Sequence, residues 1–96
     1  MNDYIILMLD DAPDSSDGDW DGYIAGLRQT GQFDGGSSIG SGQRLKQGQP
    51  DQAAGLNVTG FIRVRAASIA DAKLLLAGNP DYEAGGSVEI RELPPG

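Results

Sequence analysis

The segment that most constrains the fold is NVTGFIRVRA at residues 57–66, because small or apolar side chains alternate there with larger or charged ones. Successive side chains of a β-strand point to opposite faces of a sheet. One face of this segment carries Val58, Gly60, Ile62 and Val64. The other face carries Thr59, Phe61, Arg63 and Arg65. A strand of this pattern is half-buried, so we expect a sheet with one covered face and one open face.

Three other segments are expected to be strands. Residues 4–9, YIILML, form a continuous β-prone run that is typical of a buried central strand. A weaker strand is expected around residues 36–39, with a short piece at 44–46. The segment 87–93, SVEIREL, alternates strictly. Its inward residues are Val88 and Ile90, and its outward residues are Ser87, Glu89 and Arg91.

Two segments have the period of a helix. In the first, four apolar residues stand at i, i+3, i+4 and i+7, namely Trp20, Tyr23, Ile24 and Leu27. Ser16 is expected to cap this helix, with Asp19 three residues later, and Gly31 is expected to end it. The second helix begins at Ser68, with Asp71 in the capping-box position, and Gly78-Asn79-Pro80 ends it before a turn at 81–86. Its expected buried side consists of Ile69, Ala72, Leu75 and Leu76.

The predicted order of elements is β-α-β-β-α-β within a single domain of 96 residues. Two split β-α-β halves of this kind give an α+β fold of the ferredoxin-like type, a four-stranded antiparallel sheet with both helices on one face. Residues around 40–56 are rich in Gly, Ser and Gln and are expected to form a mobile loop.

The missing residue types exclude several kinds of chemistry. The chain has no cysteine and no histidine, so thiolate nucleophiles, disulfides, Cys-ligated zinc and histidine acid-base catalysis are excluded. A net charge of −7 disfavours nucleic acid and anionic membranes as partners. The apolar run at 4–9 is too short for a membrane span or a signal peptide, so a cytoplasmic protein is expected. No cofactor and no metal is expected.

The predicted open face suggests a homodimer. It combines Phe61 and alternate residues of 4–9 with charged side chains, a mixture that is too apolar to face open water. Two such faces, paired sheet to sheet, would enclose a polar cleft. The alternative is that the arginines and Glu89 form only cross-strand ion pairs at the rim of such an interface.

The order of the motifs resembles the YCII-related family, including its DGPF-type members. The matching pieces are YIILML at 4–9, W-x-x-Y-x-x-x-L at Trp20, Tyr23 and Leu27 with Gly35-Gly36 after it, GFIRVRAASIADAKLLLAGNP at 60–80, and GGSVEIREL at 85–93. The resemblance implies a ferredoxin-like protein that pairs as a dimeric α+β barrel. A His-Asp pair has been proposed as the reactive centre of some members, and it cannot exist here because histidine is absent. The DGPF motif is also missing, since LKQGQPDQAAGLN stands at 45–57.

Two functional hypotheses follow. The first is a homodimeric small-molecule binding or regulatory module, in which guanidinium groups of the cleft bind a small carboxylate or phosphate. The second is an enzyme of the same barrel class, with Asp10 or Glu89 as base and an arginine that stabilises negative charge. The candidate cleft residues are Arg63, Arg65, Glu89, Arg91, Ser37, Ser38 and Asp10.

A third, remote hypothesis is calcium binding at residues 17–28. The stretch DGDWDG supplies oxygen ligands at positions 1, 3 and 5 of an EF-hand loop and glycine at position 6. Position 12 requires a bidentate glutamate, but it is occupied by Arg28. The stretch is therefore interpreted as the acidic first turn of the first helix.

Overall fold

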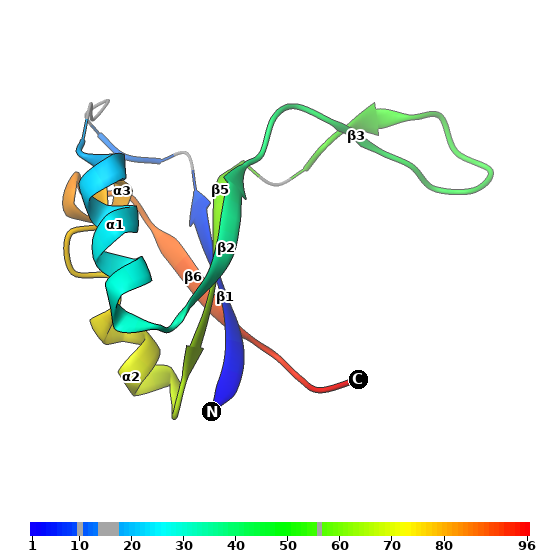
Figure 1. Cartoon of the computed structure of the whole chain (residues 1–96). Coiled ribbons are helices and arrows are strands. Elements are labelled where there is room, and N and C mark those ends of the chain that lie inside the picture. The colour runs from blue at the N-terminus through cyan, green and yellow to red at the C-terminus, as the bar shows by residue number, and fades with distance from the viewer. Residues whose placement is uncertain (10, 14–17, 56) are drawn as a thin grey trace.

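The structure of the protein, a computed structural model, describes residues 1–9, 11–13, 18–55 and 57–96. These residues form a four-stranded antiparallel sheet, a separate two-stranded ladder and three helices, so the fold is α+β as predicted. All three helices lie on one side of the four-stranded sheet (Figure 1). The elements are β1 (Asn2–Leu9), α1 (Trp20–Thr30), β2 (Phe33–Ser38), β3 (Gln43–Arg44), β4 (Gln52–Ala53), β5 (Val58–Ala66), α2 (Ile69–Leu74), α3 (Pro80–Glu83) and β6 (Val88–Leu93).

The sheet has the strand order β2-β5-β1-β6. The predicted central position of the first strand is confirmed, because β1 pairs with β5 on one side and β6 on the other. Its residue Ile6 lies opposite both Ile62 and Ile90 in the register. The predicted alternation of 57–66 is also confirmed, since Ile62 and Val64 are buried and Arg63 is exposed.

The helix-covered face of the sheet holds the core. Ile6 and Val64 have 0% exposed surface there. Tyr23 of α1 reaches the segment after α2, where its hydroxyl donates a hydrogen bond to the carbonyl oxygen of Leu75 at 2.7 Å. This bond joins the two helical regions across the core. The buried apolar residues of the cluster are Tyr4, Ile6, Met8, Tyr23, Leu27, Ile62, Val64, Ala66, Ala72 and Leu76.

The first helix begins later than its sequence suggested. The N-cap is Asp19 rather than Ser16, because the Asp19 carboxylate accepts a hydrogen bond from the Gly22 backbone N–H at 2.9 Å and satisfies one of the free amides of the first turn. Ser16 itself lies outside the described residues. The predicted end is confirmed: Gly31 has φ +73°, a left-handed conformation that glycine adopts without steric cost.

The second helix is capped as predicted, since the Ser68 hydroxyl oxygen accepts a hydrogen bond from the Asp71 backbone N–H at 3.2 Å. The prediction that Ile69 lies on the buried side of this helix is wrong. Ile69 is 47% exposed, because it lies in the first turn at the margin of the sheet, whereas Ala72 and Leu76 are buried. Within the described residues, no helix has the length and apolar character needed to cross a membrane.

A third helix, α3, covers the first part of the turn predicted at 81–86, while residues 84–85 form a turn, so the prediction of two helices is wrong. Asn79 ends one helical region and caps the next, because its side-chain oxygen accepts a hydrogen bond from the Tyr82 backbone N–H at 3.0 Å. Pro80 occupies the first position of α3, where its missing N–H costs nothing. Asn79 is fully buried.

The segment between β2 and β5 contains a hairpin, where a short strand piece at 44–46 and a mobile loop around 40–56 were expected. β3 pairs with β4 through Gln43 opposite Ala53 and Arg44 opposite Gln52, and the Arg44 side chain donates a hydrogen bond to the Gln52 side-chain oxygen. Residues 39–55, which we call the arm, project away from the sheet on the side opposite the helices (Figure 1). Leu45 of the arm is 68% exposed.

Candidate functional site: the open sheet face and the groove beneath helix α1

The open face of the sheet is built from rows of residues that face each other across β5, β1 and β6. In the middle row, Ile5 lies between Arg63 and Arg91. The row on one side consists of Phe61, Leu7 and Glu89, and the row on the other side consists of Arg65, Asp3 and Leu93. The register therefore brings together most of the cleft residues that the sequence predicted.

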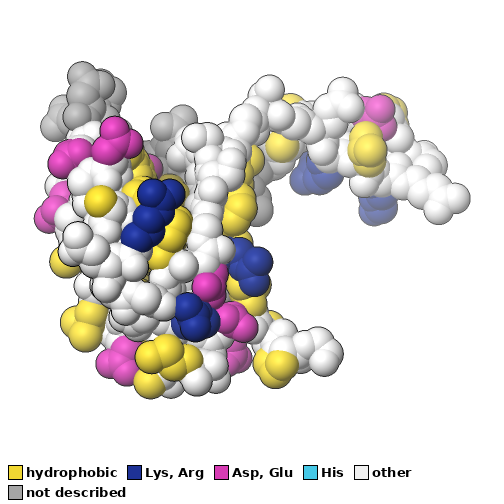
Figure 2. All heavy atoms as spheres, viewed as in Figure 1, with side chains coloured by type: hydrophobic (Ala, Val, Ile, Leu, Met, Phe, Trp, Pro, Cys, Tyr) yellow, Lys and Arg dark blue, Asp and Glu magenta, His cyan; other side chains and the backbone are white. Residues whose placement is uncertain are grey.

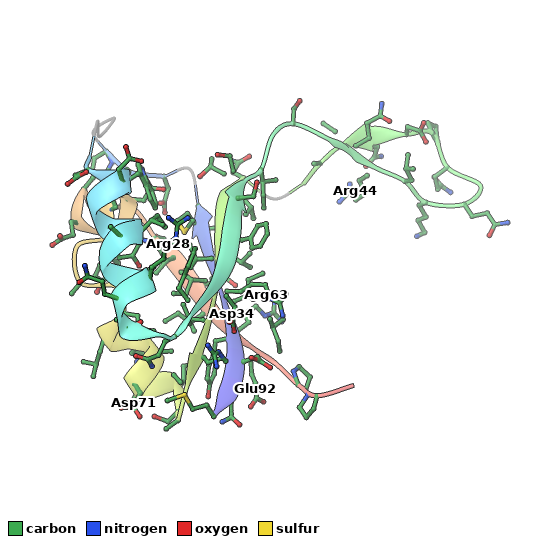
Figure 3. The ribbon with its side chains drawn as sticks, in the orientation of Figure 1. Arg28, Asp34, Arg44, Arg63, Asp71 and Glu92 are labelled. Atoms are coloured by element: carbon green, nitrogen blue, oxygen red, sulfur yellow. The ribbon has the colours of Figure 1, made fainter. Side chains whose placement is uncertain are left out.

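Arg63 and Arg91 flank the apolar centre of this face. Neighbouring strands are about 4.8 Å apart, so their two backbones, separated by β1, lie about 10 Å apart. Both residues are exposed, and Figure 3 shows Arg63 directed away from the helices. Among the described residues, no ion pair links Arg63 or Arg91 to Glu89. The cross-strand ion pairs of the alternative interpretation are therefore not formed within the described part of the single chain.

Arg65 has a different environment from the other two arginines of the face. Its Nε lies 3.0 Å from the Asp34 carboxylate, and its Nη2 donates a hydrogen bond to the Gly31 carbonyl oxygen at 2.7 Å. Arg65 thus ties β5 to β2 through Asp34 and to the end of α1 through Gly31. We assign it a structural role at the edge of the face.

The remaining predicted site residues do not lie together on the open face. Ser37 lies opposite Phe61 and so belongs to the open face, where its hydroxyl donates a hydrogen bond to the Ser38 carbonyl oxygen at 2.9 Å. Ser38 lies opposite Gly60 and belongs to the helix-covered face, because neighbouring residues of a strand point in opposite directions. Asp10 lies outside the described residues.

A carboxylate beside Asp10 has a structural role. Asp11 Oδ1 accepts a hydrogen bond from the Ser87 backbone N–H at 2.6 Å, which ties the segment after β1 to the start of β6. Hydrogen bonds from the Ser87 side chain and then from its backbone N–H lower the pKa of Asp11 from its ordinary value of 3.8. Asp11 is therefore held as a carboxylate, a hydrogen-bond acceptor at neutral pH.

The proposed calcium loop is only partly within the described residues, because Asp17 lies outside them. The carboxylate of Asp19 is engaged with the Gly22 amide as the N-cap of α1. In the part of the chain that the structure describes, no cluster of three or more carboxylates could hold a metal ion.

A groove of about 470 Å³ that was not predicted from the sequence lies on the helix-covered face. Its walls include Trp20, Ile24 and Arg28 of α1 and Phe33 of β2. The Arg28 guanidinium carbon is 5.8 Å from the centre of the Phe33 ring. Figure 2 shows a cationic side chain over hydrophobic ones in the hollow between α1 and β2, and Figure 3 shows Arg28 there, directed from α1 toward the sheet.

The signal for this groove was present in the first helix. Trp20, Ile24 and Arg28 are spaced at i, i+4 and i+8, so they follow one side of the helix. From the sequence alone, Arg28 was considered only as a misfit at position 12 of a calcium loop. The groove also requires small residues on β2 and β5, and their pairing is not visible in sequence spacing.

In comparisons with known proteins, no family model matches the chain and no curated protein matches it.

Proposed function

We propose that the protein is a homodimeric small-molecule binding or regulatory module of the YCII-related kind, whose two copies pair through the open sheet face as a dimeric α+β barrel. The observation that carries the proposal is the row Arg63, Ile5 and Arg91, in which two cations flank an apolar centre. The ligand is a small anion with a carboxylate or phosphate group.

The topology supports the family assignment. The strand order β2-β5-β1-β6, with α1 and then α2 and α3 in the two connections, is the order expected for a ferredoxin-like β-α-β-β-α-β chain. A third short helix in the second connection is compatible with that order.

The composition of the open face supports self-association. Four apolar side chains adjoin one another there and are only half-buried within the single chain, namely Ile5, Leu7, Phe61 and Leu93. A chain of 96 residues leaves much apolar surface uncovered, and a contiguous patch of this kind marks an interaction site. Arg63 and Arg91 share the face with Asp3 and Glu89, so a two-fold axis can bring opposite charges together.

The arginines support an anionic ligand. In a sheet-to-sheet dimer, Arg63 and Arg91 of each copy would border one cleft and present several hydrogen-bond donors to it. Guanidinium groups bind carboxylate and phosphate oxygens in a bidentate geometry, with stronger hydrogen bonds than neutral donors form.

The catalytic alternative receives no comparable support. A carboxylate that acts as a general base near neutral pH needs a raised pKa. Asp11, the carboxyl group next to Asp10 in the sequence, has a lowered pKa instead. Glu89, the described candidate base, is exposed at the edge strand β6.

Light scattering with a matched pair of variants tests the dimer. The wild type is expected at twice the chain mass of 10.0 kDa. Leu7→Glu places a charge in the proposed interface and should give the single-chain mass, whereas Leu74→Glu, on exposed α2, should leave the dimer intact. A wild type that remains at 10.0 kDa at high protein concentration would contradict the proposal.

Thermal unfolding with inorganic phosphate and with acetate tests the ligand class. Either anion should raise the melting temperature of the wild type by binding the folded state. The rise should disappear in the double variant Arg63→Gln with Arg91→Gln and persist in Lys73→Gln, which removes an exposed cation on α2. Equal rises in all three proteins would show that the anions act without the arginine row.

A further inference from the structure

We propose a second ligand site, independent of the dimer cleft: the groove between α1 and the β2-β5 edge binds a small molecule with a flat apolar body and one negatively charged group. Aromatic monocarboxylates are the simplest members of this class. The proposal rests on the shape of the groove, its lining and the position of Arg28.

The groove exists because small residues lie beneath the first half of α1. Gly36 lies opposite the buried residue Ile62, and two residues further along the same face Ser38 lies opposite Gly60. A Cβ atom at Gly36 would collide with the Phe61 carbonyl oxygen, so the close approach of β2 and β5 requires glycine there. The large residues of α1 thus lie opposite small residues of the sheet, namely Gly36, Ser38 and Gly60.

The size and lining of the groove suit a compact aromatic ligand. Its volume of about 470 Å³ lies within the usual range of small-molecule sites, roughly 300 to 1,000 Å³. Its apolar walls come from both layers of the protein, with Trp20 and Ile24 on the helix and Phe33 and Met8 on the sheet. Such walls favour a flat ring over a fully hydrated anion.

Arg28 supplies the charge preference. Its guanidinium group lies over the Phe33 ring, and among the described residues it forms no ion pair, although the chain has 14 acidic residues against 7 basic ones. Its place in the last turn of α1 also suits the helix dipole, which explains a cation there but not the groove beside it. A ligand carboxylate at this end would complete a charge-assisted hydrogen bond.

Asp81 limits the ligand to a single negative group. It lines the same groove and already takes part in another interaction. A second negative group on the ligand would be repelled by this carboxylate, so dicarboxylates and phosphorylated compounds are poorer ligands for the groove than monocarboxylates.

The single tryptophan of the chain makes the groove directly observable, because Trp20 is part of its wall. Titration with benzoate should change Trp20 fluorescence and reach saturation. Benzamide, which has the same ring without the charge, should bind about tenfold more weakly, the loss expected for one charge-assisted hydrogen bond. Acetate, which has the charge without the ring, should also bind more weakly, because it lacks the apolar contacts of the ring.

Two variants of the groove test the assignment to its residues. Arg28→Gln, at an exposed position, should weaken benzoate binding about tenfold and leave benzamide binding unchanged. Ser38→Leu, whose side chain would enter the groove, should weaken both ligands. The control Lys73→Gln should bind both as the wild type does, and circular dichroism should show that every variant is folded.

The failure of this proposal is distinguishable from that of the dimer cleft. Benzoate binding that survives Arg28→Gln but is lost in the Arg63→Gln, Arg91→Gln double variant would place the anion on the open face and overturn the groove site. A titration in which benzoate leaves Trp20 fluorescence unchanged would overturn it as well. Amide NMR shifts confined to β2, β5 and α1 would support it, even if the protein is a monomer.

Discussion

The two faces of the central strand β1 differ although they are built from alternate residues of the same segment. On the helix-covered face, Ile6 has 0% exposed surface, while its neighbour Ile5 on the open face is half-buried. The covered face therefore carries most of the stability of the single chain. The open face is left available for an interaction, and its side chains can be changed at a smaller cost to folding.

The helix-covered face is itself uneven. Toward α2 it is closed by Ala72 and Leu76, which are buried in the core. Toward the β2 edge it has Gly36, Ser38 and Gly60 beneath α1, and the groove remains open. The size of the side chains on the sheet thus decides where the helical layer makes a core and where it makes a pocket.

The sharpest test of the difference between the faces is a pair of identical substitutions at adjacent positions. Ile6→Ala should lower the free energy of unfolding by about 2–5 kcal/mol, since it removes a fully buried side chain and leaves a cavity. Ile5→Ala should cost clearly less in the single chain, because that side chain already contacts solvent. Urea denaturation at low protein concentration measures both values.

If both variants lose the same free energy of unfolding, the open face is as strongly packed as the covered one. If the loss for Ile5→Ala grows with protein concentration, Ile5 contributes to stability through the dimer.

A second test concerns the attachment of the helical layer. Asn79→Ala should lower the free energy of unfolding by about 1–2 kcal/mol, because it removes the buried cap of α3 and its bond to the Tyr82 amide. Ser68→Ala, at the cap of α2, provides the matched comparison with a more exposed hydroxyl. Denaturation of both variants measures the difference, and a larger loss for Ser68→Ala would contradict the core position assigned to Asn79.

A third test uses the hydroxyl that joins α1 to the segment after α2. Tyr23→Phe should lower the free energy of unfolding by about 0.5–1.5 kcal/mol at neutral pH, through loss of the hydrogen bond to the Leu75 carbonyl oxygen. Burial raises the pKa of Tyr23 above its ordinary value of 10.0, although the Asn79 side chain opposes this shift.

Because the folded state favours the neutral phenol, this contribution is complete below pH 10 and is lost as the pH rises through the folded pKa. Tyr23→Phe should therefore unfold with less dependence on pH in the alkaline range. Thermal unfolding above pH 10 checks this, and identical alkaline profiles of the two proteins would contradict it.

The smallest effect is expected at Asp11, on the segment after β1. Hydrogen bonds from Ser87 lower the pKa of Asp11 from 3.8, so the carboxylate form is favoured in the folded state. Its contribution is present above pH 3.8 and is lost as the pH falls through the folded pKa. Asp11→Asn should make unfolding less dependent on pH in this acidic range, and Ser87→Ala should act in the same direction.

The fold was predictable where the signals are local. The alternation of Ile62 with Arg63, the cap at Ser68 and the left-handed Gly31 each depend on a few neighbouring residues, and all three are confirmed. Helix α3 was missed because Asn79-Pro80 is equally a stop for one helix and a cap with a first residue for another. Only the packing around Asn79 decides between them.

The two candidate sites also differ in whether local sequence patterns indicate them. The residues of the open face were predicted because Arg63 and Arg91 each lie in a segment whose apolar and charged side chains alternate, although in β6 the alternation breaks at Glu92 and Leu93. The groove was missed because it depends on the pairing of Ser38 with Gly60 and on a helix that crosses above them. Neighbours of this kind are more than twenty residues apart in the sequence, at 38 and 60.

The register of β1 with β6 has a practical consequence for protein engineering. Asp3 lies opposite Leu93, so the first and last strands have their outer ends side by side in the sheet. A short linker from Gly96 to Met1 could join them, and new termini could be opened in the turn of the arm between Arg44 and Gln52. Such a circular permutant would keep all four sheet strands intact and would place both new termini in the arm, away from the sheet.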